Sequence, residues 1–375
     1  MSDTMIGLEL RSEITAGAEL ELSLVEVVLG EPGPDEIVVK VEAAPINPSD
    51  IGILLGPADL ATMVAGGTRD RPVLRFEVPE SRMPAVRARL GVSLLVGNEG
   101  AGTVVKAGTE VQHLLGSKVG MFGGGMYARY RKIAARDCMV LPDGASAAEG
   151  AAMFVNPLTA LGFVEAMKME GHTAIVHTAA ASNLGQMLNR ICLADGVPLV
   201  NIVRSAAQAD LLRDQGASHV VDSSAPDFEA CLTDAIAATG ATIGFDAIGG
   251  GRLASQILTA MEQTANRKGG NYSAYGSGAY KQIYIYGGLD RSPTVLDRTY
   301  GMAWGVASWL LMPFLQKAGP DIAARLRQRV VDELKTTFAS HYSATISLAD
   351  ALRPEVLSAY ERKATGEKYL IDPSR

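Results

Sequence analysis

One segment, in which a strand runs through a turn of small residues into a helix, constrains the fold more than any other feature. TAIVH at 173–177 predicts a strand, and NLGQMLNR predicts the helix that follows it. Between them, small residues replace the first two glycines of a GxGxxG spacing, and the third glycine remains. Such a turn lets backbone approach a diphosphate, which the helix N-terminus stabilises. The residues predicted to bind it are Ala180, Ser182, Asn183, Leu184 and Gly185.

The alternation of strands and helices continues beyond this turn. VPLVNIV, SHVVD, ATIGFDA and QIYIYGG predict further strands, each separated from the next by a segment of helical pattern. Strands that alternate with helices predict a parallel, doubly wound sheet. We therefore expect an α/β Rossmann domain over residues 156–319, and we expect helices to dominate from about residue 300 to residue 360.

The first 150 residues have a different pattern, dominated by short strands with glycine between them. ELSLVEVVLG and DEIVVKVEAA, for example, flank a Pro/Gly turn. EKYLID near the end predicts one more strand, which could return to this domain. We therefore expect a β-rich domain made of residues 1–155 and 320–375, with the Rossmann domain inserted.

The end of the second Rossmann strand predicts which dinucleotide binds. About 20 residues after the glycine turn, NAD enzymes place an acid that binds the ribose hydroxyls. This chain has Arg204 there with no adjacent Asp or Glu, and a guanidinium can bind a 2′-phosphate. Asn201 could add a hydrogen bond. The residues thus favour NADPH, although Arg204 could also be a solvated arginine at a strand end.

Glycines follow two other predicted strands, in FDAIGGG and YIYGGLD. Ligands of open α/β sheets bind at the carboxyl ends of the strands. Gly249, Gly250, Gly287 and Gly288 could therefore let backbone approach the nicotinamide half of the cofactor. Ordinary tight turns are the alternative.

Composition excludes several other classes of protein. The net charge of −7 lacks the basic footprint of a nucleic-acid binder. The three cysteines, Cys138, Cys192 and Cys231, form no CxxC pair and fit buried free thiols in a reducing cytosol. We expect no leader peptide and no membrane span, and therefore a cytoplasmic protein.

Taken together, the motifs resemble those of the medium-chain dehydrogenase/reductase superfamily, and within it the quinone oxidoreductases and the 2-enoyl thioester reductases. The segments that carry the resemblance are APINPSDI, GNEGAGTVVKAGTEV, GMYARY, NPLTAL, HTAAASNLGQ, NIVRS, LLRDQGASHVVD, FDAIGG and YGGL. The resemblance implies a GroES-like catalytic domain beside the Rossmann domain, and commonly a homodimer. It also implies cofactor roles for Asn47, Thr159 and Tyr286, with Asn47 and Thr159 at the reacting centre.

The zinc-dependent members of this superfamily carry a cysteine in the early loop and a GHE motif. This chain has Asn47 and Asn98 at those places, so we expect no metal. The enoyl reductases place a tyrosine where this chain has Ala58, which disfavours enoyl-thioester reduction. The expected function is hydride transfer from NADPH to a quinone or an α,β-unsaturated carbonyl compound. A 2-enoyl thioester reductase and a non-catalytic NADPH-binding protein are the alternatives.

Two segments look like insertions, 58–91 and 262–281. Both are expected to be surface loops, with a lid or a dimer contact as the functional alternative. Tyr272, Tyr275 and Tyr280 in the second insertion would suit either role.

Overall fold

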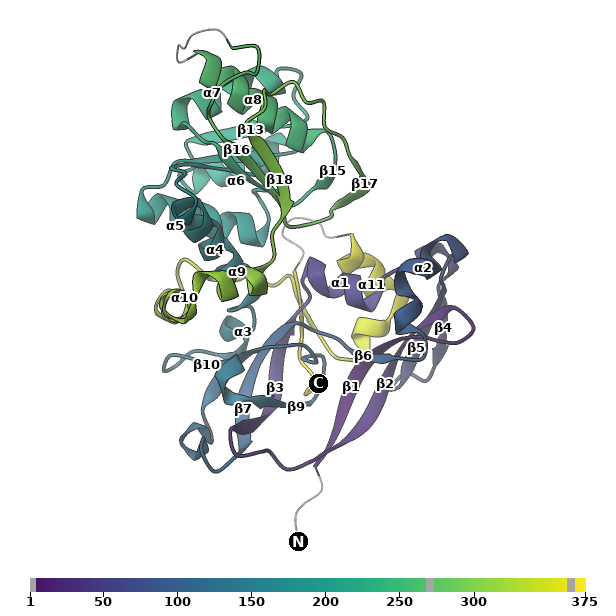
Figure 1. The fold of residues 1–375 in the computed structure, drawn as a ribbon. Helices are drawn as coiled ribbons and strands as arrows, with labels where there is room; N and C mark the ends of the chain where they lie inside the picture. Colours follow the sequence, from purple (N-terminus) through teal and green to yellow (C-terminus); the bar gives the residue numbers. More distant parts are fainter. Residues whose placement is uncertain (1–4, 268–272, 363–367) are drawn as a thin grey trace. The chain divides into compact units, whose positions relative to one another are not determined.

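The computed structural model describes most of the chain (Figure 1). The described residues are 5–267, 273–362 and 368–375.

The chain forms two compact units. The first unit comprises 1–155 and 329–375, and the second comprises 156–328. The second division falls inside the helix α10 (Pro320–Asp332), whereas the sequence analysis placed it at the beginning of that helix.

A five-stranded antiparallel sheet in the first unit has the order β4-β5-β2-β1-β6. Part of it comes from the first insertion, which is therefore not merely a surface loop. Leu74 and Phe76 alternate with exposed residues and are buried, so that segment pairs with β2 as a strand. The strands are β1 (Met5–Ile14), β2 (Glu19–Leu29), β4 (Val64–Gly67), β5 (Pro72–Glu77) and β6 (Ser93–Leu95).

The second sheet of this unit has the order β10-β8-β7-β3-β20-β19, with β9 also paired to β3. The C-terminal strand β20 pairs with β3, Leu370 opposite Pro45, which confirms the predicted return of the chain to the first domain. The strands are β3 (Glu36–Pro45), β7 (Glu99–Ala107), β8 (Lys118–Phe122), β9 (Tyr130–Ala134), β10 (Cys138–Val140), β19 (Ala344–Ile346) and β20 (Tyr369–Ile371).

One apolar cluster holds both sheets and two helices of the first unit together. Ile51 and Leu54 enter it from α1, and Leu357 and Tyr360 enter it from α11. Burial of this apolar area is the main stabilising contribution to the unit. The helices are α1 (Pro48–Leu54), α2 (Met83–Val86), α3 (Ala147–Gly150) and α11 (Pro354–Glu361).

The second unit has a six-stranded parallel sheet with the order β13-β12-β11-β14-β16-β18. The strand order reverses between β11 and β14, as in a doubly wound nucleotide-binding fold. The prediction that helices dominate from residue 300 onward was wrong for β18, which is a strand. A short apolar run is compatible with either a strand or a helix. The strands are β11 (Ile175–His177), β12 (Leu199–Val203), β13 (His219–Asp222), β14 (Ile243–Asp246), β16 (Lys281–Ile285) and β18 (Trp304–Ser308).

Helices connect the strands of this sheet. One helical stretch, 147–169, is long and apolar enough for a membrane span, but 89% of its apolar window is buried in the protein. A helix that is apolar on all sides and covered is typical of a protein core. The helices are α4 (Val155–Met169), α5 (Asn183–Asp195), α6 (Ala206–Asp214), α7 (Phe228–Thr239), α8 (Leu253–Arg267) and α9 (Leu311–Ala318).

A buried ion pair joins the two ends of the second insertion. Lys281 Nζ lies 2.5 Å from Glu262 Oε2, and both side chains are almost fully buried. Ser277 Oγ donates to the same carboxylate at 2.5 Å. Tyr275 is exposed and the Tyr280 hydroxyl donates to Gln282, while Tyr272 lies outside the described residues.

Candidate functional site

The turn between β11 and α5 has the geometry that close backbone approach requires. Ala179 has a left-handed φ of 50°. The Ser182 hydroxyl caps α5 by accepting from the Gly185 amide at 3.1 Å. A Cβ atom at Gly185 would lie 2.2 Å from the Ala180 carbonyl oxygen. Glycine is therefore needed there for the helix to pack on the turn, as the sequence predicts.

We expect the Gly185→Ala variant to lose about 1–3 kcal/mol of stability, because its methyl group would push α5 away from the turn. Thermal denaturation measures this loss. Gly278→Ala is the matched control, since a Cβ atom there meets nothing within 4 Å. Equal melting temperatures for the two variants would contradict the packing argument.

A buried carboxylate links this turn to the loop after β14. Asp246 accepts a hydrogen bond from Thr178 Oγ1 at 2.7 Å and from the amides of Ile248 and Gly249 at 2.9 and 3.1 Å. Thr178 Oγ1 in turn accepts from the Ala247 amide at 2.8 Å. The network fixes the two loops at the point where the strand order reverses. The sequence analysis did not identify Thr178 or Asp246, because neither belongs to the glycine pattern.

Arg204 and Asn201, both at β12, have different surroundings. Arg204 follows the strand and is exposed, and its guanidinium makes no hydrogen bond or ion pair with any residue that the structure describes. Asn201 is 1% exposed, and its amide nitrogen lies 3.4 Å from Asn189 Oδ1. Arg204 is thus available to a ligand. Phosphate binding by Asn201 stays a prediction, and its observed contact lies within the domain.

The glycines after β14 and β16 pack against one another. A Cβ atom at Gly249 would lie 2.8 Å from the Gly287 carbonyl oxygen, and one at Gly287 would lie 2.6 Å from the Ala247 carbonyl oxygen. They allow the short strands β15 (Gly249–Gly251) and β17 (Asp290–Thr294) to pair. Gly288 is exposed with open space around it. Loop packing alone therefore accounts for Gly249 and Gly287, and their contact with a cofactor stays a prediction.

Tyr286 pairs with a buried histidine at the same edge of the sheet. Its hydroxyl lies 2.8 Å from His177 Nε2. Burial lowers the pKa of His177 to about 3, so the imidazole is neutral at physiological pH. Burial, and then the charge of Asp246, raise the pKa of Tyr286. The pair is therefore uncharged at neutral pH. On α4, Thr159 is 7% exposed.

In the first unit, Asn47 and Glu99 form a buried hydrogen-bonded pair. Asn47 Nδ2 donates to Glu99 Oε1 at 2.7 Å, and Glu99 Oε2 accepts from the amides of Phe154 and Val155 at 2.9 and 2.8 Å. Burial raises the pKa of Glu99, while the charge of Lys368 and these hydrogen bonds lower it. Asn47 precedes α1 at the N-cap position, but its side chain reaches Glu99.

A second buried carboxylate, Asp50, lies on α1. It accepts from the amides of Asn47 and Asn98, both at 2.8 Å, and is fully buried. Burial, with a smaller contribution from the charge of Glu99, raises the pKa of Asp50 to about 7 despite the hydrogen bonds from the two amides. The Tyr127 hydroxyl donates to the Pro45 carbonyl at 3.0 Å. Asp50 therefore titrates near neutrality.

Lys368 adds a cation to this cluster. Burial lowers the pKa of Lys368, and the charges of Glu99 and Asp50 oppose that shift. Its ammonium lies 5.5 Å from the centroid of the Tyr342 ring. Lys368 Nζ and Asn47 Oδ1 are buried and have no hydrogen-bond partner among the described residues. Buried polar atoms without partners are rare and mark candidate ligand contacts.

We call Asn47, Asp50, Glu99 and Lys368 the buried polar cluster. Asp50 and Glu99 stand in quoted motifs, INPSD and GNEG, and could have been found there, whereas nothing in the sequence singles out Lys368. The described residues contain no group of three metal-ligating side chains, and the expectation of no metal stays a prediction. None of the three cysteines forms a disulfide, but only Cys192 is buried and Cys231 is exposed, so the expectation of three buried thiols was wrong.

The raised pKa of Asp50 predicts a pH dependence of stability. Between about pH 6 and pH 8 the unfolded carboxyl is ionised while folded Asp50 still titrates, so the folded state binds more protons. The free energy of unfolding should therefore lose about 1 kcal/mol from this group as the pH rises across that window. Urea denaturation at both pH values measures the change.

In Asp50→Asn this contribution should disappear, while the exposed control Asp143→Asn should keep it. An unchanged pH slope in Asp50→Asn would contradict the assignment.

Comparison with known proteins gives a family match in the first unit. Residues 33–143 match the alcohol dehydrogenase GroES-like domain. Over the whole length, the chain is similar to a candidate NADPH:quinone reductase from Mesorhizobium loti, with a TM-score of 0.73 and 26% identity over 100% of both chains.

Two curated relatives represent different activities. The mitochondrial enoyl-[acyl-carrier-protein] reductase of Xenopus tropicalis is 29% identical over 208 residues, 53% of this chain and 51% of that protein. A quinone oxidoreductase of Pseudomonas aeruginosa is 32% identical over 133 residues, 34% of this chain and 41% of that protein. The chain thus spans about half, or less, of the length of these relatives.

Proposed function

We propose that this chain, which has the GroES-like domain and the α/β fold of the medium-chain dehydrogenase/reductase superfamily, is a metal-independent NADPH-dependent reductase of quinones or α,β-unsaturated carbonyl compounds. The observation that carries the proposal is the turn after β11 together with Arg204. The turn needs glycine at 185 for close packing, and an exposed guanidinium without a partner among the described residues stands where an acid would select NAD.

The residues at the strand ends fit the cofactor. The turn from Ala180 to Gly185 would hold the diphosphate at the N-terminus of α5, and Arg204 would bind the 2′-phosphate. When bound, NADPH supplies a hydride from C4 of its nicotinamide. We propose that Thr159, Tyr286 and the loop glycines 249, 287 and 288 contact the nicotinamide half.

The buried polar cluster would stabilise charge that develops on the acceptor oxygen. Asn47 has one amide hydrogen committed to Glu99 and a second one to offer. Lys368 is the stronger donor, because its ammonium has no hydrogen-bond partner among the described residues. A donor in a buried site stabilises an oxyanion more than it would in water. Glu99 and Asp50 would keep Lys368 protonated.

Substrate turnover tests the proposal. Stopped-flow oxidation of NADPH by a simple naphthoquinone should be rapid. Turnover only with a 2-enoyl thioester would favour the second candidate, which similarity to the Xenopus enoyl reductase supports and Ala58 disfavours. Tight binding of NADPH without turnover of either compound would indicate a non-catalytic protein.

Arg204→Ala should raise the KM for NADPH by about tenfold or more, because a charge-assisted pair to the 2′-phosphate is lost. The KM for NADH should hardly change. Steady-state kinetics with both cofactors measures the difference, and Arg204→Lys should recover part of it. Equal effects on NADPH and NADH would show that Arg204 does not recognise the phosphate.

Lys368→Met should lower kcat by about 100-fold with little change in the KM for NADPH, as expected for a lost oxyanion donor. The kcat–pH profile should also lose its alkaline limb. Lys368→Arg, which keeps the charge, should restore part of the rate. A rise in KM without a fall in kcat would contradict this role.

We also propose that the protein is a cytoplasmic homodimer. The strand β18 forms an edge of the six-stranded sheet, and Met302 and Leu310 nearby are 75% and 63% exposed. An open edge strand with apolar neighbours can pair with a second copy. Sedimentation equilibrium should give twice the chain mass, and a monomer at micromolar concentration would exclude the dimer.

A further inference from the structure

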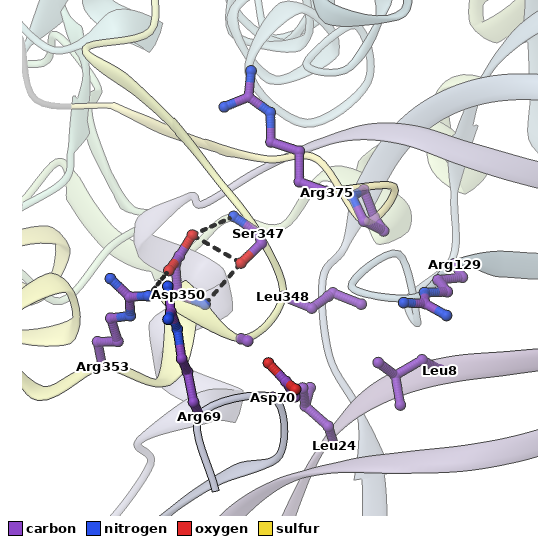
Figure 2. Close-up of a pocket in the computed structure, with 12 residues that line it drawn as sticks. Leu8, Leu24, Arg69, Asp70, Arg129, Ser347, Leu348, Asp350, Arg353 and Arg375 are labelled. Carbon is purple, nitrogen blue, oxygen red and sulfur yellow. Dashed lines mark hydrogen bonds and ion pairs between the residues drawn. The ribbon is translucent and has the colours of Figure 1, made fainter.

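A cavity of about 380 Å³ lies in the first unit, lined entirely by residues outside the buried polar cluster (Figure 2). Its walls come from β1, β2, the turn between β4 and β5, the residue before β9, and the C-terminal segment from 347 onward. Its volume is in the range of small-molecule binding sites. Five separate segments line the cavity, so no single sequence motif could predict it.

Positive charge predominates in the lining. Arg69, Arg129, Arg353 and Arg375 face the carboxylates of Asp70 and Asp350. Figure 2 shows Arg69 and Arg353 next to Asp350, with Arg129 on the opposite side of the cavity.

Two of the four guanidinium groups are already committed within the protein. Arg353 pairs with Asp350 at 2.8 Å. Asp350 also accepts from the Ser347 hydroxyl at 2.8 Å. Arg375 pairs with Asp372 at 3.3 Å and donates to the Thr345 carbonyl at 3.1 Å. These contacts fix one wall of the cavity and neutralise the charges of Arg353 and Arg375.

Arg69 and Arg129 remain available. Neither side chain makes a hydrogen bond or ion pair with any residue in the described part of the chain, and both residues are exposed. Although Arg69 feels the charge of Asp350, that carboxylate already pairs with Arg353. Two guanidinium groups without partners, presented from separate segments on opposite sides of the cavity, can together balance the double negative charge of a phosphate monoester.

The rest of the lining is apolar. Leu8 and Leu348 are 7% and 3% exposed, and Leu24 and Pro373 complete this surface. Inorganic phosphate would leave the apolar surface uncovered, whereas an organic group attached to the phosphate would bury it.

We propose that this cavity binds a phosphate monoester that carries an apolar group, with Arg69 and Arg129 on the phosphate and Leu8 and Leu348 against the apolar group. The proposal does not depend on the reductase activity. The phosphate would belong to a small molecule, because the phosphate that attaches a 4′-phosphopantetheine arm to its carrier is a diester with only one negative charge.

Isothermal titration calorimetry of the full chain with phenyl phosphate tests this site, with NADP⁺ present to occupy the dinucleotide site. Arg69→Gln and Arg129→Gln should each weaken binding by about tenfold or more. Asp70→Asn should strengthen it, because it removes a repelling carboxylate. Arg87→Gln is the matched control, since Arg87 is exposed in the same unit and lies outside the cavity.

Three results would overturn the proposal: no heat with phenyl phosphate, equal weakening by Arg87→Gln, or binding of inorganic phosphate as tight as that of phenyl phosphate. Circular dichroism should show that each variant is folded. Methyl phenyl phosphate, a diester with one negative charge, should bind more weakly than phenyl phosphate, and equally tight binding of the two would contradict recognition of a monoester. Arg204→Ala should leave phenyl phosphate binding unchanged, which separates failure of this site from failure of the proposed cofactor site.

Discussion

The close approach of α5 to the Ala180 carbonyl is the constraint on which the nucleotide-binding edge depends. It requires glycine at 185, and it brings the first turn of the helix up to the strand end. Helix dipole and amide groups can then act on an anion in the same place. The turn tolerates Ala180 and Ser182 in place of glycines, and the Ser182 side chain stabilises α5 by capping its N-terminus. The Thr178–Asp246 hydrogen bond ties the neighbouring loop to the same point.

The first unit buries several ionisable groups, Asp50, Glu99 and Lys368, inside a β-rich domain. Burying a charge is costly unless it is paired and hydrogen-bonded. Asp50 and Glu99 each accept two or more hydrogen bonds from the protein, and Lys368 supplies the opposite charge. The remaining imbalance appears as a raised pKa at Asp50 and as unpartnered atoms on Lys368 and Asn47. Carboxylates with a purely structural role would not require unpartnered polar atoms beside them. For this reason we propose that the acceptor oxygen is stabilised at this cluster.

Some of the sequence-based expectations were wrong or incomplete for physical reasons. The charged residues of segment 58–91 predict a loop. In the structure, Leu74 and Phe76 are buried at alternate positions, and part of the segment is a strand of the first sheet. Cofactor contact by Gly249 and Gly287 stays a prediction, and the structure adds that packing against a carbonyl of the neighbouring loop also requires glycine at both positions. Cofactor binding by Asn201 also stays a prediction: Asn201 lies within β12 and is buried, whereas Arg204 follows the strand and is exposed.

Local pattern predicted most strands and helices of the parallel sheet, the small-residue turn after β11, and Arg204 in the place of an acid. These features depend on residues that are close in sequence, whose spacing and size act directly on the backbone. Only the tertiary structure decided which side chains meet: Asn47 with Glu99, Lys368 with both carboxylates, and Arg69 with Arg129 around one cavity. Those contacts join segments separated by tens to hundreds of residues. The pKa shifts of Glu99 and Lys368 arise mainly from burial, which no single segment of the chain specifies.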